Sequence, residues 1–430
     1  MPTRNITLMC MNTPVLEYNV DDGLFDVLNE KLLPYPLKDK FRELPSSEGL
    51  LTKTAIDKYV KHRDYIRDKN NETFNRWLQN RLLPVGRENS KRIALALGSD
   101  PVPKMKLIYL CRGLSLTDNY WLKLSGDNST WKEVNLREVS LSEAIAYVAL
   151  HGTSASLQTV PRTPEVTNQG AYAKAWLRRD GALWLYKKGA NQTTAESRIE
   201  VMVSNILDKC NVRHVAYEMS EEPDPDGVAI STCCRCKCIT DDTHMILSAM
   251  DFNSYCLSHD LKFDAECKRI DPDLYYKMII VDYLTANRDR HLLNWGFFVS
   301  SIDNHIYCMH PLFDHNNAFD IAYMNKPDSP YQAIPEVTMR EAALDAIKHV
   351  DFHFTEAITR DDFITQRQYE VFTSRAKELQ IKLDKDDMLN WCKKNAPESM
   401  SSLSDVELIR DMHDSWLNYL RNEYGAPCTL

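Results

Sequence analysis

The chain has 430 residues, of which 43% are apolar and 26% are charged, and this mixture is typical of soluble globular proteins. Wholesale disorder, collagen and coiled-coil structures are therefore excluded. The 52 Lys and Arg residues and 61 Asp and Glu residues give a net charge of -9, which provides no overall attraction to nucleic acid or to an anionic membrane. We therefore expect no membrane partner and no nucleic acid as a direct ligand.

Two further features bear on location and on the type of nucleotide site. The N-terminus lacks the continuous apolar stretch of a signal peptide, no segment is apolar enough for a membrane helix, and the 12 cysteines are expected as thiols, so we expect a cytoplasmic protein. Among the 13 glycines no two are two positions apart, which excludes the dinucleotide-binding fingerprint, and GxxxxGK[ST] is also absent. A phosphate-binding site must therefore be of another design.

Residues 1–100 are predicted to form a small, partly helical domain. Apolar residues at helical spacing predict helices over Thr52–Arg67, Phe74–Leu82 and Ser90–Leu97, the last ended by Gly98. Between them, the basic segment 83–92 is interpreted as surface packing, with contact to a partner or nucleic acid as the alternative.

Residues 101–238 are predicted to be rich in β-structure. Short apolar runs at 106–111 and Tyr120–Leu124 indicate strands, and the Ser-, Thr- and Pro-rich segment Gly152–Gln169 indicates a linker or mobile loop. The clearest local signal is a β-hairpin over Ala173–Lys188 with an Asp-Gly turn.

An amphipathic helix is predicted to follow this hairpin, over Glu196–Cys210. Strands are expected near Val212–Glu218 and Val228–Ile239. From residue 239 to 430 the pattern is largely helical, which completes a three-part division at residues 100 and 238.

The polar residues that carry chemistry gather at the end of an apolar helix. Asp289 and Asn294 are spaced as in R-D-x-x-x-x-N, the catalytic loop of protein kinases. In that loop the Asp accepts the proton of the substrate hydroxyl, and the Asn amide oxygen binds magnesium. Asp314 follows, and its carboxylate is the second hard oxygen ligand that magnesium prefers.

Upstream, Lys187 ends the second strand of the hairpin and Glu200 lies in the following helix. This is the order of the strand lysine that contacts ATP phosphates and the helix glutamate that holds it. Glu196 is an alternative partner for Lys187, although Glu200 fits the phase of the helix better. Each residue alone has an ordinary structural explanation, but their common order favours a kinase.

At this point a family resemblance becomes specific. The segments Asn287–Asn294 (NRDRHLLN) and Pro311–Asp314 (PLFD) resemble the N-x-D-R-H-x-x-N and P-x-[FY]-D motifs of HipA-like serine/threonine kinases. Gly113–Trp121 (GLSLTDNYW) also resembles an element that precedes the kinase core in some members, and Gly170–Lys174 resembles their phosphate-loop entry. These are bacterial proteins whose fold is related to that of phosphatidylinositol kinases.

The resemblance implies a role for each matching residue. Asp289 is the expected catalytic base, His291 orders its loop, Asn294 and Asp314 bind Mg2+, and Lys187 contacts the ATP phosphates. The expected ATP-binding residues also include Glu200 of the helix and three residues of the phosphate loop, Gln169, Gly170 and Ala171. Gly170 is the single glycine of this loop. The family also implies autophosphorylation, for which a serine or threonine within 153–167 is a hypothesis, and an antitoxin-like or regulatory protein partner in a toxin–antitoxin pair.

One cysteine-rich run offers an alternative chemistry. Cys233, Cys234, Cys236 and Cys238 lie close together, but zinc sites normally need two separated ligand pairs. We interpret the run as a strand near a hinge between two lobes, where backbone groups can meet adenine.

Together these patterns predict an α+β, bilobed protein-kinase-like fold with a β-rich N-lobe, a helical C-lobe and an extra N-terminal domain. The expected function is Mg2+- and ATP-dependent phosphorylation of a serine or threonine on a protein substrate. Two alternatives remain: a catalytically silent nucleotide-binding regulatory module, and a kinase for a lipid or small molecule.

Overall fold

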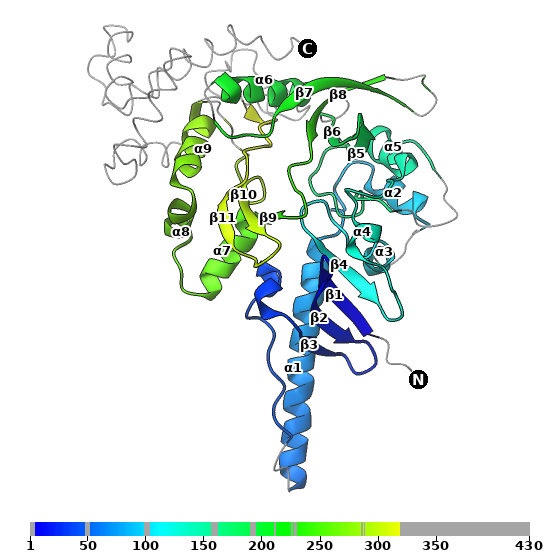
Figure 1. Ribbon diagram of the computed structural model, residues 1–430, viewed down its shortest axis with the longest axis vertical. Helices are drawn as coiled ribbons and strands as arrows, with labels where there is room; N and C mark the ends of the chain where they lie inside the picture. Colours follow the sequence, from blue (N-terminus) through cyan, green and yellow to red (C-terminus); the bar gives the residue numbers. More distant parts are fainter. Residues whose placement is uncertain are drawn as a thin grey trace, which may run out of the picture.

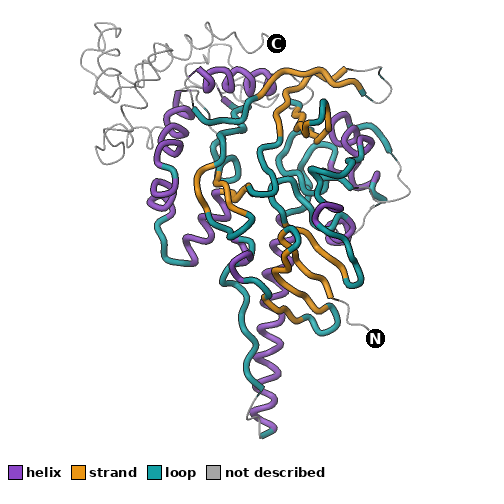
Figure 2. The backbone as a smooth tube through the Cα atoms, viewed as in Figure 1, coloured by secondary structure: helices purple, strands orange, loops and turns teal. Residues whose placement is uncertain are grey.

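The computed structural model describes residues 5–47, 52–98, 104–155, 162–189, 195–209, 212–224, 227, 230–284, 287 and 289–318. These residues form a mixed α+β structure, as predicted, with three antiparallel sheets. Figures 1 and 2 show the sheets distributed along the molecule, with helices packed around each of them. The predicted helical segment beyond residue 318 lies outside the described residues.

The first sheet contains three strands that the sequence did not predict. Its order is β3-β2-β1-β4, formed by β1 (Asn5–Cys10), β2 (Thr13–Asn19), β3 (Leu24–Val27) and β4 (Tyr120–Leu124). Only β4 was expected. The division at residue 100 stays a prediction, although strands from both sides of it pair in this sheet.

The helix beside this sheet is longer than predicted. The two segments expected as separate helices form one helix, α1 (Lys53–Asn80), because the polar stretch between them contains neither glycine nor proline. The C-terminal half of α1 is packed into the core through Phe74, Trp77 and Leu78. Its N-terminal half extends away from the body of the molecule (Figure 1).

Short helices complete this part of the chain. They are the 3-10 helices η1 (Glu30–Leu32) and η2 (Tyr35–Leu37), and α2 (Ser90–Ala96), α3 (Lys104–Leu110), α4 (Trp131–Val134) and α5 (Glu143–His151). The prediction of a strand over 106–111 is wrong, because this short apolar run forms α3 and buries Leu107, Ile108 and Cys111. Gly98 has a φ of 71°, which is consistent with its predicted place after α2.

The second sheet carries the predicted hairpin. Its order is β5-β6-β8-β7, formed by β5 (Lys174–Arg179), β6 (Ala182–Lys187), β7 (Tyr217–Pro223) and β8 (Ile230–Lys237). The turn residues Asp180 and Gly181 both have positive φ angles, as a tight hairpin turn requires. The predicted helix is confirmed as α6 (Ala195–Lys209), which contacts β7 and β8.

One strand of this sheet begins later than expected. The segment before β7 pairs with another part of the chain: the Val215 amide donates to the Leu312 carbonyl (2.8 Å), and the Leu312 amide donates to Arg213 (3.1 Å). This pairing replaces the strand predicted from Val212. It also brings the segment around Asp314 beside the second sheet.

The third sheet was not expected in the part of the chain after residue 239, which is predicted to be largely helical. It consists of β9 (His244–Ser248), β10 (Gly296–Ser300) and β11 (Ile306–Met309) in the order β11-β10-β9. The predicted helices are present beside it as α7 (Ala249–Ser258), α8 (Phe263–Ile270) and α9 (Pro272–Leu284). Strands of four or five residues are too short to show a clear alternating pattern.

The expected mobile linker and the expected cysteine thiols can both be compared with the structure. The end of the predicted linker is packed rather than mobile, since Thr163, Glu165, Val166 and Thr167 are all buried. The described cysteines are free thiols, including those of the β8 run. In the described part of the chain, no helix has the length and apolar character needed to cross a membrane.

Candidate active site

Three predicted residues meet at the end of β6. The amine Nζ of Lys187 donates to Oε2 of Glu200 (2.9 Å) and to Oδ1 of Asp314 (2.6 Å). The other carboxylate oxygen of Glu200 accepts the backbone amide of His315 (2.9 Å). The choice between Glu196 and Glu200 is therefore decided by geometry in favour of Glu200, although Glu196 is also buried.

This cluster keeps its charges despite burial. Burial alone opposes the ionisation of Asp314, yet the positive charges of Lys187 and Lys174 hold its pKa well below its usual range. Burial likewise opposes the charge of Lys187, but Asp314 and Glu200 raise its pKa well above the usual value. The site therefore contains an ionised carboxylate and an ammonium group in direct contact.

The loop that carries Asp289 and Asn294 is held by its own polar groups. The side-chain amide Nδ2 of Asn294 donates to the backbone carbonyl of Asp289 (2.8 Å). Because this bond uses the amide nitrogen, the amide oxygen of Asn294 remains to accept a ligand. Asp289 is partly exposed, with 42% of its side chain accessible, so its carboxylate can meet a substrate hydroxyl.

Arg290 connects this loop to the segment that carries Asp314. Its guanidinium forms two bonds with Asp282 of α9 (2.8 and 3.0 Å). Its Nη1 donates to the backbone carbonyls of both Asn294 and Phe313 (2.8 Å each). One nitrogen atom thus fixes the two expected metal ligands relative to each other. The sequence analysis assigned no role to Arg290, although it lies within the quoted motif.

Two further residues contact the expected base. The amide Nδ2 of Asn317, which the sequence analysis did not single out, donates to Oδ2 of Asp289 (2.7 Å). His291 is exposed, and its Nε2 lies 3.9 Å from Oδ1 of Asp289. The Nδ1 atom of His291 accepts the amide of Leu293 (3.2 Å), which fits its expected role in ordering the loop.

The phosphate loop lies next to this cluster through Lys174. Lys174 pairs with Lys187 across β5 and β6, so both side chains are on the same face of the sheet. Gly170 has a φ of 101°, and a Cβ atom placed on it would lie only 2.2 Å from Nζ of Lys174. A side chain at residue 170 would therefore displace the amine of Lys174 from the position that it occupies.

The other two predicted residues of the phosphate loop are turned toward the N-terminal region. The side-chain amide of Gln169 donates to the carbonyls of Leu82 (3.0 Å) and Asn80 (3.3 Å). The carbonyl of Ala171 accepts the amide of Glu88 (2.8 Å). Any contact of Gln169 or Ala171 with ATP is therefore expected from the backbone amides of the loop rather than from these groups.

Lys174 gives a prediction for the pH dependence of ATP binding. Burial and the nearby charge of Lys187 lower the pKa of Lys174 to about 8. Bound phosphates favour the charged amine and raise this pKa, so binding takes up a proton above pH 8 and ATP affinity should fall as the pH rises from 7 to 9. Isothermal titration should show this fall in the wild type and a weaker one in Lys174→Met. Equal slopes in the two proteins would contradict the placement of Lys174 at the phosphates.

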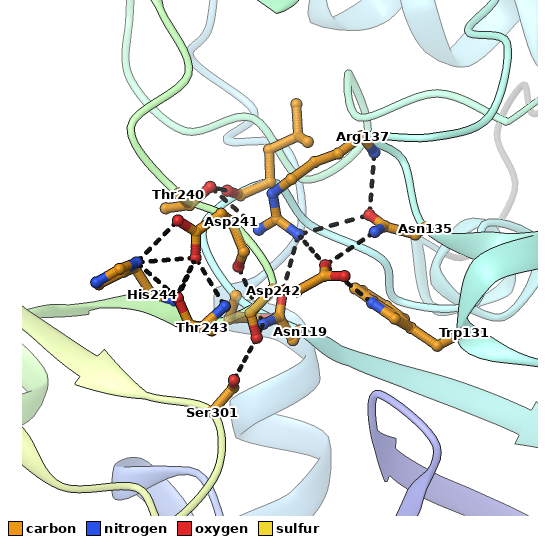
Figure 3. Close-up of polar contacts among 12 residues, drawn as sticks. Asn119, Trp131, Asn135, Arg137, Thr240, Asp241, Asp242, Thr243, His244 and Ser301 are labelled. Atoms are coloured by element: carbon orange, nitrogen blue, oxygen red, sulfur yellow. Dashed lines mark hydrogen bonds and ion pairs between the residues drawn. The ribbon is translucent and has the colours of Figure 1, made fainter.

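The segment that joins the second and third sheets is held by the Gly113–Trp121 element. The side-chain amide of Asn119 donates to the backbone carbonyls of Asp241 and Asp242 (3.1 Å each). The amide of Ile246 donates to the carbonyl of Thr117 (2.7 Å). These contacts give the GLSLTDNYW motif a structural explanation, since it binds the chain at the predicted hinge; Figure 3 shows the contacts of Asn119.

Arg137 extends this network, as Figure 3 shows. Its guanidinium donates to Oδ1 of Asn119 (2.8 Å) and to Oγ1 of Thr240 (3.1 Å). Asp242 also accepts bonds from Trp131 and Asn135 (3.0 Å each). The hinge is therefore fixed by side chains from the residues that precede the second sheet.

The chemistry of the donor set fits a magnesium ion with ATP. Asn294 supplies an amide oxygen that its bond to Asp289 does not use, and Asp314 supplies an ionised carboxylate; both are hard ligands. Gly170 and Lys174 form a cradle with positive charge beside them. The cysteine run lies in β8 and directly after it, as predicted for a strand. Within the described ranges, no group of three or more His, Cys, Asp or Glu side chains is arranged to hold a metal.

The chain is similar to several solved structures, two of which bear the names of kinases or toxin–antitoxin proteins. No family model and no curated protein matches the chain. The chain is similar to a proinflammatory kinase, CtkA, of Helicobacter pylori, with 14% identity, a TM-score of 0.29, and coverage of 58% of this chain and 94% of that chain. It is also similar to a Shewanella oneidensis MR-1 structure of HipA and HipB with operator DNA, a toxin–antitoxin system. That match has 10% identity, a TM-score of 0.44 and coverage of 97% of both chains.

Proposed function

We propose that this protein is a Mg2+- and ATP-dependent serine/threonine protein kinase of the HipA-like type. The observation that carries the proposal is the contact of Lys187 with both Glu200 and Asp314, next to a loop that presents Asp289 and Asn294. These are the five groups that a protein kinase needs to hold ATP and activate a hydroxyl. The transferred group is the γ-phosphoryl group of ATP.

In this proposal Asp289 accepts the proton of the substrate hydroxyl while that oxygen attacks the γ-phosphorus. Asn317 donates to Oδ2 of Asp289 and so holds the carboxylate in place for the proton transfer. Lys187 and Lys174 bind phosphate oxygens and offset their charge, so positioning and electrostatics provide most of the rate.

Asn294 and Asp314 would hold the magnesium ion. A magnesium ion held there would supply positive charge that offsets the negative charge of the phosphate groups. Lys187 reaches both the glutamate of α6 and Asp314, so it keeps the second sheet and the ligand-bearing segment at a fixed distance. Arg290 likewise holds the backbone of Asn294 and the backbone next to Asp314 at a fixed distance from each other.

The alternative of a silent nucleotide-binding module makes a different prediction. The catalytic base, both ligands and the lysine are all present, which favours turnover. A silent module would be stabilised by ATP, with a higher melting temperature, but would not consume it. Thermal shift and ATP consumption, measured on the same sample with magnesium, separate the two functions.

Protein and lipid are tested in parallel as acceptors of the phosphoryl group. Labelled ATP is incubated with the protein and either a bacterial lysate or vesicles that contain phosphoinositides. Label on protein serine or threonine supports the proposal. Label on lipid alone would favour the lipid-kinase alternative, which the net charge of -9 makes less attractive at an anionic surface.

Burial reduces the number of serine and threonine residues within 153–167 that can be autophosphorylated. Thr163 and Thr167 are buried, and the hydroxyl of Thr167 donates to the carbonyl of Leu114 (2.8 Å). Neither hydroxyl is accessible in this conformation, whereas Ser154 is exposed. Ser156 and Thr159 lie outside the described residues. A phosphosite map without modification in 153–162 would contradict this part of the proposal.

An antitoxin-like or regulatory protein partner and a cytoplasmic location are also part of the proposal. Both come from the motif resemblance and from the composition of the chain. Affinity purification of the tagged protein from its own host, followed by identification of the copurified chains, tests the partner.

A further inference from the structure

Arg87, which precedes α2, is packed against the predicted phosphate loop, between Glu165 and Lys174. The segment 83–92 was interpreted as a basic surface corner, but the side chain of Arg87 has 0% exposure. Its Nη1 atom donates to the carbonyls of Asn168 (3.0 Å) and Glu165 (3.3 Å), and Nη2 donates to the carbonyl of Lys174. One guanidinium therefore binds the backbone at both ends of the loop.

The partner of Arg87 belongs to the same loop. Nη2 of Arg87 lies 3.1 Å from Oε2 of Glu165, whose side chain is also at 0% exposure. Glu165 in turn accepts the amide of Trp176 in β5 (2.8 Å) and the side-chain amide of Asn168 (3.3 Å). A buried ion pair thus connects the start of the loop to the first strand of the hairpin.

These bonds determine the direction of the peptide groups. In a trans peptide, the carbonyl of one residue and the amide of the next point in opposite directions. Because the carbonyls of Asn168 and Ala171 are bound by Arg87 and Glu88, the amides of Gln169 and Tyr172 point away from the N-terminal segment. Both amides are thereby left on the side of the loop away from this segment, where they can donate to an anion.

We propose that Arg87 and Glu165 are positioning residues that hold the phosphate loop in the shape that binds the ATP phosphates. The inference rests on the proposed function, because it assigns the loop to ATP. It also explains how a loop with a single glycine keeps the required backbone shape: the guanidinium binds three of its carbonyls and so fixes their direction. The N-terminal region is then part of the nucleotide site.

The two nucleotides that test this proposal are ATP and adenosine, because only ATP carries the phosphates. The main variant is Arg87→Met combined with Glu165→Gln, which removes both charges and therefore leaves no unpaired buried ion. Its Gln retains an oxygen for the amide of Trp176. Arg87→Lys is a second variant that keeps the charge but cannot bind the same set of carbonyls.

Arg81→Lys serves as the matched control. Arg81 also forms a largely buried ion pair, with Asp118 (2.5 Å), and binds the carbonyl of Gly113 (2.7 Å), but none of its recorded contacts is with the phosphate loop. It should lower the melting temperature without changing the ratio of ATP affinity to adenosine affinity.

We expect the double variant to lose ATP affinity by about tenfold or more and to change adenosine affinity by less than about twofold. Arg87→Lys should show the same pattern to a smaller extent. An unchanged ratio in a folded Arg87 variant, with normal ATP binding by the wild type, would overturn the positioning role alone. A wild-type protein that binds neither nucleotide would overturn the proposed function and this inference with it.

Discussion

Replacement of Asp289 with asparagine is expected to slow phosphoryl transfer by about 10^2- to 10^4-fold, the usual contribution of a general base. Asparagine has nearly the same shape and retains an oxygen for the amide of Asn317, so the loop should keep its geometry. ATP affinity should stay close to that of the wild type, because Asp289 forms no recorded bond with the Lys187 cluster in the described residues. Single-turnover transfer and ATP titration measure the two effects separately.

The control for this prediction is Asp303→Asn. Asp303 lies in the turn between β10 and β11, and its carboxylate accepts the amide of His305 (3.2 Å). This control should have wild-type transfer rates. If Asp289→Asn retained more than about a tenth of the wild-type rate, Asp289 would not be the base.

Replacement of Lys187 with methionine should have the second large effect, on both activity and stability. It removes the cation that holds Glu200 and Asp314 together, and it leaves the buried carboxylate of Glu200 and the partly buried carboxylate of Asp314 without it. Loss of one partner from a buried ion pair costs about 3–5 kcal/mol, so the free energy of unfolding should fall by that order. Transfer should fall by about a hundredfold or more, because an electrostatic contact to the phosphates is lost.

The stability loss in Lys187→Met should depend on pH in a defined direction. In the wild type the pKa of Asp314 is held below its unfolded value, so its contribution to stability is present at neutral pH and is lost as the pH falls below about 4. Without Lys187 the attraction that lowers the pKa of Asp314 is reduced, so the difference from the wild type should be largest at neutral pH and should shrink on acidification. Urea unfolding at several pH values measures this.

A second variant separates stability from catalysis at this cluster. Lys187→Met combined with Glu200→Gln removes one of the two unpaired charges and should recover part of the stability, without recovery of transfer. Recovery of activity together with stability would show that Lys187 has only a structural role.

The sequence predicted the local part of this site well. The Asp-Gly turn defines the β5–β6 hairpin, and the helical phase of α6 selects Glu200, so the contact between Lys187 and Glu200 could be anticipated from residues 13 positions apart. The order of Asp289, Asn294 and Asp314 was likewise visible as a motif. The structure brings Lys187, Glu200 and Asp314 into direct contact and links Asn294 to Asp289.

The missing parts depend on contacts between distant residues. Arg87 and Glu165 are 78 positions apart, and no periodicity indicates that an arginine in a basic segment is fully buried. Residues 106–111 form a helix although their composition resembles that of a strand, because burial rather than propensity decides such short runs. Arg290 lies within the quoted motif, but its bonds to Asp282 and to two backbone carbonyls join distant segments, so the motif alone does not indicate its role.

The most direct test of the central claim is transfer of the labelled γ-phosphoryl group from ATP, with magnesium, by the wild type, Asp289→Asn and Asp314→Asn. Label should be found on serine or threonine, either of the protein itself or of proteins in a bacterial lysate, and it should be lost in both variants. If the wild type bound ATP without any transfer of label, or if both variants labelled as the wild type does, the kinase function would be contradicted.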